Sequence, residues 1–165
     1  MKKTILIAGL LISGFVFQTA SAQVKLDVSV NIDTQPEWGP VGYDHVEYYY
    51  LPDIDVYYYV PKQQYIYLNR GHWKFRASLP DRYSNYDIYT GYKVVINEPT
   101  PYHNADVYRS QYEGYKGRHD QEIIRDSNDS KYFTNKHNPK HRIWRQSYHR
   151  HNNGRKKQIE VNDRQ

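Results

Sequence analysis

The sequence predicts a mainly β protein: a small antiparallel meander sheet or SH3-like partial barrel, with one short helix and a disordered basic C-terminal tail. Three observations support this fold class. Tyrosine, a good strand former, occurs 19 times in 165 residues. Short apolar and aromatic segments at residues 24–97 are separated by turns that contain Pro, Gly, Asn or Asp. Residues 116–165, in contrast, contain no Leu, Ala or Met.

A secretory signal peptide is expected at residues 1–22. Two lysines precede an apolar stretch at residues 5–17, which is shorter than the roughly 20 residues of a membrane span. Ala20-Ser21-Ala22 matches a small-residue cleavage signal, so we expect cleavage before Gln23 and export to the periplasm or the extracellular space. A retained membrane anchor is the alternative, and the short apolar stretch argues against it.

Six strands are expected within a Tyr-rich β domain at residues 23–115. The first strand alternates apolar and polar side chains, which is typical of a strand with one buried face. Short turns separate several of the others, and such turns indicate antiparallel hairpins. The expected strands are residues 24–32, 43–51, 54–60, 65–68, 73–77 and 92–97.

A short helix is expected at residues 105–115, with Asn104 as its N-cap. Tyr108, Tyr112 and Tyr115 then fall on one helical face, which is suited to docking on the sheet. The preceding segment, residues 78–91, contains Pro and Gly and is expected to be irregular.

Residues 116–165 form the expected tail, which is basic, His-rich and mostly disordered. Val, Ile and Phe together account for only six of its residues, too few for a core. The tail carries 13 Lys and Arg against 6 Asp and Glu, whereas residues 23–115 carry 8 against 12. The sequence therefore combines an acidic body with a basic tail, in which only residues 121–133 are expected to dock.

One long motif is distinctive. Residues 38–61 read WGPVGYDHVEYYYLPDIDVYYYVP, and YKVVINEP follows at residues 92–99. This pattern resembles a group of small, Tyr-rich, exported bacterial proteins that have no assigned activity. The resemblance covers residues 28–115 and implies export and a shared module, without implying catalytic residues.

The first candidate binding site is an aromatic face of the sheet. If the aliphatic residues of the third to fifth strands face the core, aromatic and cationic side chains occupy the other face. Planar rings beside cations are suited to stacking on sugars or bases. The structural alternatives are cross-strand Tyr pairing, or burial beneath the helix or residues 78–91. The candidate residues are Tyr57, Tyr59, Tyr65, Tyr67, Lys74 and Arg76, together with Trp38 from a loop.

The second candidate is a metal site formed by His137, His141, His149 and His151 of the tail. Imidazole binds Zn, Cu and Ni, but Pro139 disfavours ligation by a helical pair and the chain has no Cys. We therefore expect a solvated basic tail whose histidines are incidental or, as the alternative, a weak and unselective metal site. No cofactor is predicted.

The sequence contains none of the nucleophile-elbow, zinc-protease or phosphate-loop motifs, and we do not expect an enzyme. We expect an exported cell-envelope protein, an interaction or structural module whose basic tail adheres to anionic envelope polymers. The alternative is a glycan-binding module that uses the aromatic sheet face. Nucleic acid is not an expected partner of an exported chain, and no transmembrane segment is expected after signal cleavage.

Overall fold

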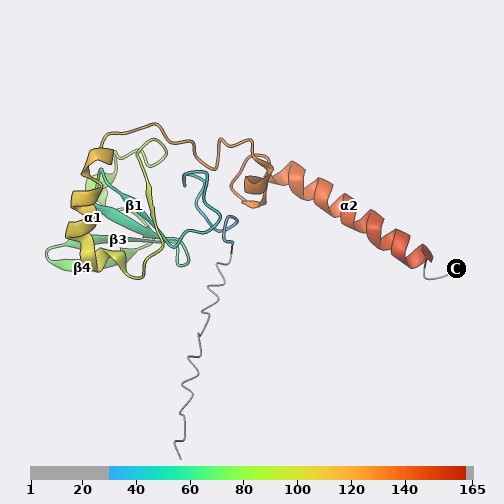
Figure 1. Cartoon of the computed structure of the whole chain (residues 1–165), viewed down its shortest axis with the longest axis horizontal. Coiled ribbons are helices and arrows are strands. Elements are labelled where there is room, and N and C mark those ends of the chain that lie inside the picture. The colour runs from blue at the N-terminus through green and yellow to red at the C-terminus, as the bar shows by residue number, and fades with distance from the viewer. Residues whose placement is uncertain (1–29, 163–165) are drawn as a thin grey trace, which may run out of the picture.

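The computed structural model describes the backbone of residues 30–162 and the side chains of residues 30–155 (Figure 1). The predicted signal peptide and most of the predicted first strand lie outside the described residues. The prediction that this strand continues to residue 32 is wrong, because Ile32 lies in a turn. The turn forms because the amides of Thr34 and Gln35 both donate to the carbonyl of Asn31.

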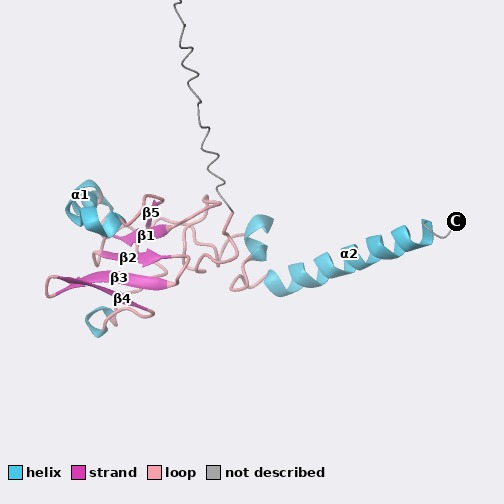
Figure 2. Ribbon diagram, turned by 90° about the horizontal axis from the view of Figure 1, so that it is seen from below, coloured by secondary structure: helices cyan, strands magenta, loops and turns pink. Residues whose placement is uncertain are grey.

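Five antiparallel strands form one sheet with the order β4-β3-β2-β1-β5 (Figure 2). The strands are β1 Tyr48–Leu51, β2 Val56–Tyr59, β3 Gln64–Asn69, β4 His72–Arg76 and β5 Val94–Ile96. Strands β1 to β4 form the predicted meander, and β5 returns to pair with β1. The prediction of a mainly β fold is confirmed, and the meander is the form that the sheet takes.

Tight turns set the register of the meander. Arg70 and Gly71 connect β3 to β4 with φ values of 51° and 75°. Two consecutive positive φ values are typical of the two-residue hairpin turn that matches the twist of a sheet. This turn places Asn69 opposite His72. The longer turn between β2 and β3 includes Gln63, also at positive φ, and places Tyr59 opposite Gln64.

Other segments pack on both faces of the sheet, and only the outer part of the β3–β4 hairpin is left exposed. On one face, Tyr49, Val56 and Tyr58 pack with Trp38 and with the irregular segment around residues 79–89. The other face is covered by helix α1, Ala105–Gln111, as the sequence predicts. Helix α1 is followed by a short 3₁₀ turn, Glu113–Tyr115. The sheet is therefore the middle layer of the body and not an open platform.

The predicted cap of α1 is wrong in one respect. Asn104 precedes the helix but makes no capping hydrogen bond through its side chain. It already belongs to a 3₁₀ turn, Pro101–Asn104, that leads into α1. The chain therefore enters α1 in a helical conformation, and the side chain of Asn104 stays exposed.

Packing continues beyond Tyr115, because residues 121–138 run back along the first described segment of the chain. Ile123 forms an isolated β-bridge with Pro40. Ile124 and Tyr132 are buried and pack against Ile32. The predicted docking of residues 121–133 therefore occurs. We call residues 121–138 the clasp, because they fasten the later part of the chain to its first described segment.

Helix α2, His141–Asn162, follows the clasp and projects away from the body (Figure 1). The sequence analysis predicts mostly disorder here, since the tail lacks core residues. A helix forms because residues 141–162 contain no Pro and are rich in Arg, Gln and Lys, which favour helix. Among residues 30–162, no helix is long and apolar enough to cross a bilayer.

Candidate functional site

The predicted aromatic face is wrong, because its residues are divided between the two faces of the sheet. Tyr57 pairs with Ile66, and Tyr58 pairs with Tyr65. Directly paired residues point to the same side of a sheet. Tyr57 and Tyr59 therefore lie on the α1 side, whereas the four other strand candidates lie on the opposite side. Those four are Tyr65, Tyr67, Lys74 and Arg76.

Most of these rings are also too deeply buried to be accessible to a ligand. Tyr57 is fully buried beneath α1, where its ring meets Tyr108 edge-on. Tyr67 is buried on the other face, with the Arg82 guanidinium 5.3 Å from its ring centre. Tyr59 stacks on Tyr48 at 4.7 Å. These tyrosines are therefore buried beneath covering segments and paired across strands, which is the structural alternative to a sugar-stacking face.

The four tail histidines do not come together. Among the side chains of residues 30–155, no three His, Asp or Glu residues lie close enough to hold a metal ion. His141 contacts the Phe133 carbonyl through Nδ1, at 2.8 Å. His149 and His151 are exposed on α2, two residues apart and hence on different sides of the helix. The predicted metal site is not formed by these residues.

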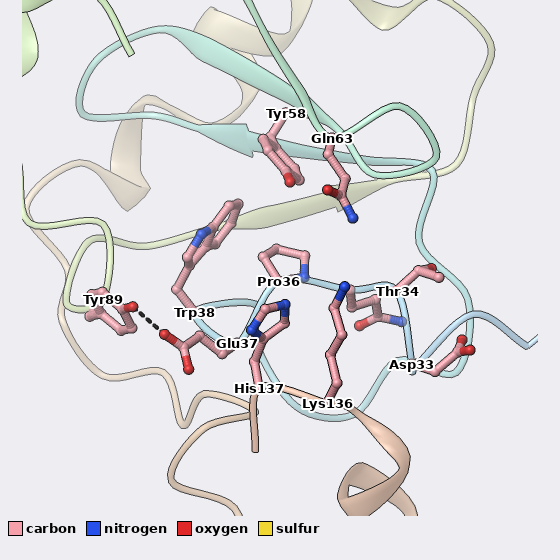
Figure 3. A pocket seen from close by; sticks show the side chains of 11 residues that line it. Asp33, Thr34, Pro36, Glu37, Trp38, Tyr58, Gln63, Tyr89, Lys136 and His137 are labelled. Atoms are coloured by element: carbon pink, nitrogen blue, oxygen red, sulfur yellow. Dashed lines mark hydrogen bonds between the residues drawn. The ribbon is translucent and has the colours of Figure 1, made fainter. Parts of the chain in front are cut away.

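The structure instead brings Trp38 and His137 together in one open pocket of about 410 Å³ (Figure 3). Four separate parts of the chain supply the wall: residues 33–38, the hairpin that joins β2 to β3, Tyr89, and the clasp. The aromatic, charged and amide side chains among its lining residues include Glu37, Trp38, Tyr58, Gln63, Lys136 and His137.

Aromatic contacts fix the inner wall of the pocket. The Trp38 ring meets Tyr49 edge-on at 5.4 Å and Tyr58 edge-on at 4.9 Å. Tyr49 is fully buried and donates a hydrogen bond to Gln35, which is itself buried. Burial raises the pKa of Tyr58. The Tyr58 hydroxyl, like that of any tyrosine at its ordinary pKa of about 10, is protonated at neutral pH and can donate to a ligand.

An acidic group is held at one end of the pocket. Glu37 accepts a hydrogen bond from the Tyr89 hydroxyl (Figure 3). This hydrogen bond is the main reason why the pKa of Tyr89 is raised. The Arg125 guanidinium lies 4.3 Å from the centre of the Tyr89 ring. Glu37 is thereby oriented, and its second carboxylate oxygen accepts no hydrogen bond from the described side chains.

Asn135 of the clasp positions Lys136 and His137 of the pocket. Its fully buried amide donates to the carbonyls of Ile32 and Gln35, at 2.9 and 2.6 Å. Its side-chain oxygen accepts from the amide of His137, at 3.0 Å. Lys136 and His137 are therefore held against residues 33–38, although about 100 residues separate these segments in the sequence.

The second candidate surface is α2. Arg142, Arg145, Arg150 and Arg155 lie on this helix, and they are exposed. None of the four forms an ion pair with a carboxylate among the described side chains. Trp144 stacks on Tyr148 at 5.4 Å beside them.

Sequence reasoning identified the basic charge of the tail but missed Tyr58, Gln63, Glu37 and Lys136 of the pocket. No local pattern marks these residues, because they meet only through tertiary contacts. Comparison with protein families, curated proteins and solved structures finds no match to this chain. Function is therefore inferred from the pocket and from α2 alone.

Proposed function

We propose that this protein is an exported, non-enzymatic interaction module of the cell envelope, which binds anionic polymers through α2. One observation carries the proposal. The arginines of α2 are exposed on a helix that projects from the body, and they have no acidic partner within residues 30–155. A guanidinium group pairs with phosphate or carboxylate through two hydrogen bonds, and is therefore suited to polymers that carry these groups.

The charge distribution favours such binding at the tail. Residues 23–115 have more acidic than basic side chains, so the body as a whole attracts a polyanion less than α2 does. Residues 137–157 contain seven Lys and Arg and no acid. The α2 helix thus combines the highest positive charge of the chain with the greatest reach from the body.

The experiment measures retention of the full exported chain on immobilised lipopolysaccharide as the salt concentration is raised. Wild-type protein should elute by about 0.5 M salt, since screening shortens the range of charge interactions to a few ångströms. The variant Arg142→Gln, Arg145→Gln, Arg150→Gln should elute at clearly lower salt. Gln has nearly the helix propensity of Arg, so α2 should persist, which circular dichroism can check.

The matched control removes three exposed positive charges from outside α2: Lys62→Gln, Arg76→Gln and Lys116→Gln. We expect this variant to elute at nearly the wild-type salt concentration, although both variants have the same net charge. Equal elution of the two variants would contradict binding through α2.

Export is tested separately. The N-terminal sequence of protein recovered from a bacterial envelope fraction should begin at Gln23. A steady-state cytoplasmic form that keeps Met1 would contradict this part of the proposal.

A further inference from the structure

We infer that the pocket between Trp38, Tyr58 and Lys136 binds an acidic sugar residue of the hexuronic acid type. This site is separate from α2 and shares no residue with it. The inference therefore does not rest on the proposed function, and it replaces the aromatic sheet face as the place where a glycan would bind.

Polar groups converge on the pocket from two opposite sides. Figure 3 shows Tyr58 and Gln63 pointing into it from the sheet side, and Lys136 and His137 pointing in from the clasp. The Tyr58 hydroxyl and the side-chain amide of Gln63 make no hydrogen bond to any described residue, whereas the backbone amide of Gln63 donates to the carbonyl of Val60. Polar groups that line a concave site and lack protein partners are those that bind a polar ligand.

The cation in this set indicates a ligand with negative charge. The Lys136 ammonium forms no ion pair within the described part of the chain. Neither carboxylate of the pocket, Glu37 or Asp33, forms an ion pair with Lys136 among the described side chains, and Glu37 accepts a hydrogen bond from Tyr89 instead (Figure 3). A ligand carboxylate beside Lys136 would form a charge-assisted hydrogen bond, the stronger kind in a partly enclosed site.

The remaining groups match the other parts of a sugar. Gln63 and the second oxygen of Glu37 can pair with hydroxyl groups, as donor and acceptor. The Pro36 ring and the rings of Trp38 and Tyr58 supply apolar surface for the C–H face of a pyranose ring. The pocket volume, about 410 Å³, suits one residue of a glycan with an open side for its neighbours.

The test uses galacturonic acid and its neutral counterpart galactose as probes, with the full exported chain. Binding is followed by nuclear magnetic resonance, through the indole N–H signal of Trp38, and by calorimetry. We expect saturable binding of galacturonic acid with a dissociation constant of about 1 mM. Galactose should bind about tenfold more weakly, since it lacks the charge-assisted hydrogen bond to Lys136.

Two variants separate a binding role from a structural one. Tyr58→Phe keeps the buried ring and removes the hydroxyl, and should weaken binding of both sugars about fivefold. Lys136→Gln should abolish the preference for galacturonic acid while leaving galactose binding unchanged. The matched control is Lys62→Gln, which removes an exposed charge one residue away from Gln63 and should change neither value.

Three results would overturn the inference. The first is the absence of a saturable Trp38 shift up to about 50 mM galacturonic acid, a range that covers even weak sugar binding. The second is wild-type binding by both Tyr58→Phe and Lys136→Gln. The third is loss of galacturonic acid binding in the α2 variant Arg142→Gln, Arg145→Gln, Arg150→Gln, which would place binding on the helix. Retention of sugar binding by that α2 variant supports the inference, even if the variant no longer binds lipopolysaccharide.

Discussion

Replacing Asn135 with Ala should destabilise the protein by about 3 kcal/mol. Asn135 is fully buried, and its amide is a hydrogen-bond partner of the Ile32 and Gln35 carbonyls, at 2.9 and 2.6 Å. Alanine leaves both carbonyls without this donor, and each unsatisfied buried polar group costs about 1–3 kcal/mol. The backbone amide of His137 also loses its acceptor. It lies nearer the surface, where water can replace the lost bond, so we assign it little cost.

Urea unfolding followed by tryptophan fluorescence measures this loss. The control is Asn104→Ala, because Asn104 is exposed and makes no capping hydrogen bond. The control should stay within about 0.5 kcal/mol of wild type. Asn135→Ala should also speed trypsin cleavage at Lys131 and Lys136, since the clasp opens more often. A free energy of unfolding equal to that of the control would refute the view that Asn135 holds the clasp.

Two further predictions concern the body. Gly91→Ala should lower stability by about 1–3 kcal/mol in a thermal melt, because the new Cβ would lie 2.0 Å from the Tyr86 hydroxyl. The control is Gly114→Ala, whose Cβ meets nothing within 4 Å and which should leave stability unchanged. Burial lowers the pKa of Lys93 to about 8, below its usual value of about 10.4. Between these two pH values the folded state therefore binds fewer protons than the unfolded state, so the contribution of Lys93 to stability rises with pH. Lys93→Met should remove that rise when urea unfolding is compared at about pH 7 and pH 10; an unchanged pH slope would count against it.

The hairpins could be predicted from the sequence, but the way in which their faces align could only partly be predicted. Between β3 and β4 the two-residue turn fixes the register, and Tyr65 and Tyr67 share a face with Lys74 and Arg76, as the sequence predicts. Between β2 and β3 the prediction grouped tyrosines with tyrosines by residue type. The turn length instead pairs Tyr57 with Ile66. Alternation shows which residues share a face within one strand, whereas the exact turn decides which faces of two strands coincide.

The candidate site was harder to predict than the fold. Trp38 and His137 were both singled out from the sequence, but for different sites, a sugar-stacking surface and a metal centre. Their meeting depends on Asn135, a single polar residue in a segment with too few apolar side chains for a core of its own. Only Ile123, Ile124 and Tyr132 of the clasp are buried apolar residues, and the body supplies the rest of the contact.

The clasp also has a consequence for the order of folding. Strands β1 to β4 pair with their neighbours in sequence, whereas Asn135 reaches Ile32 across 103 residues. Closing so long a loop costs more chain entropy than closing a hairpin, so the hairpins should form first and the pocket last. A partly folded chain would then possess its sheet but no binding pocket. Ligand binding at this pocket would therefore report that the whole chain, from its first described turn to the clasp, has reached its final structure.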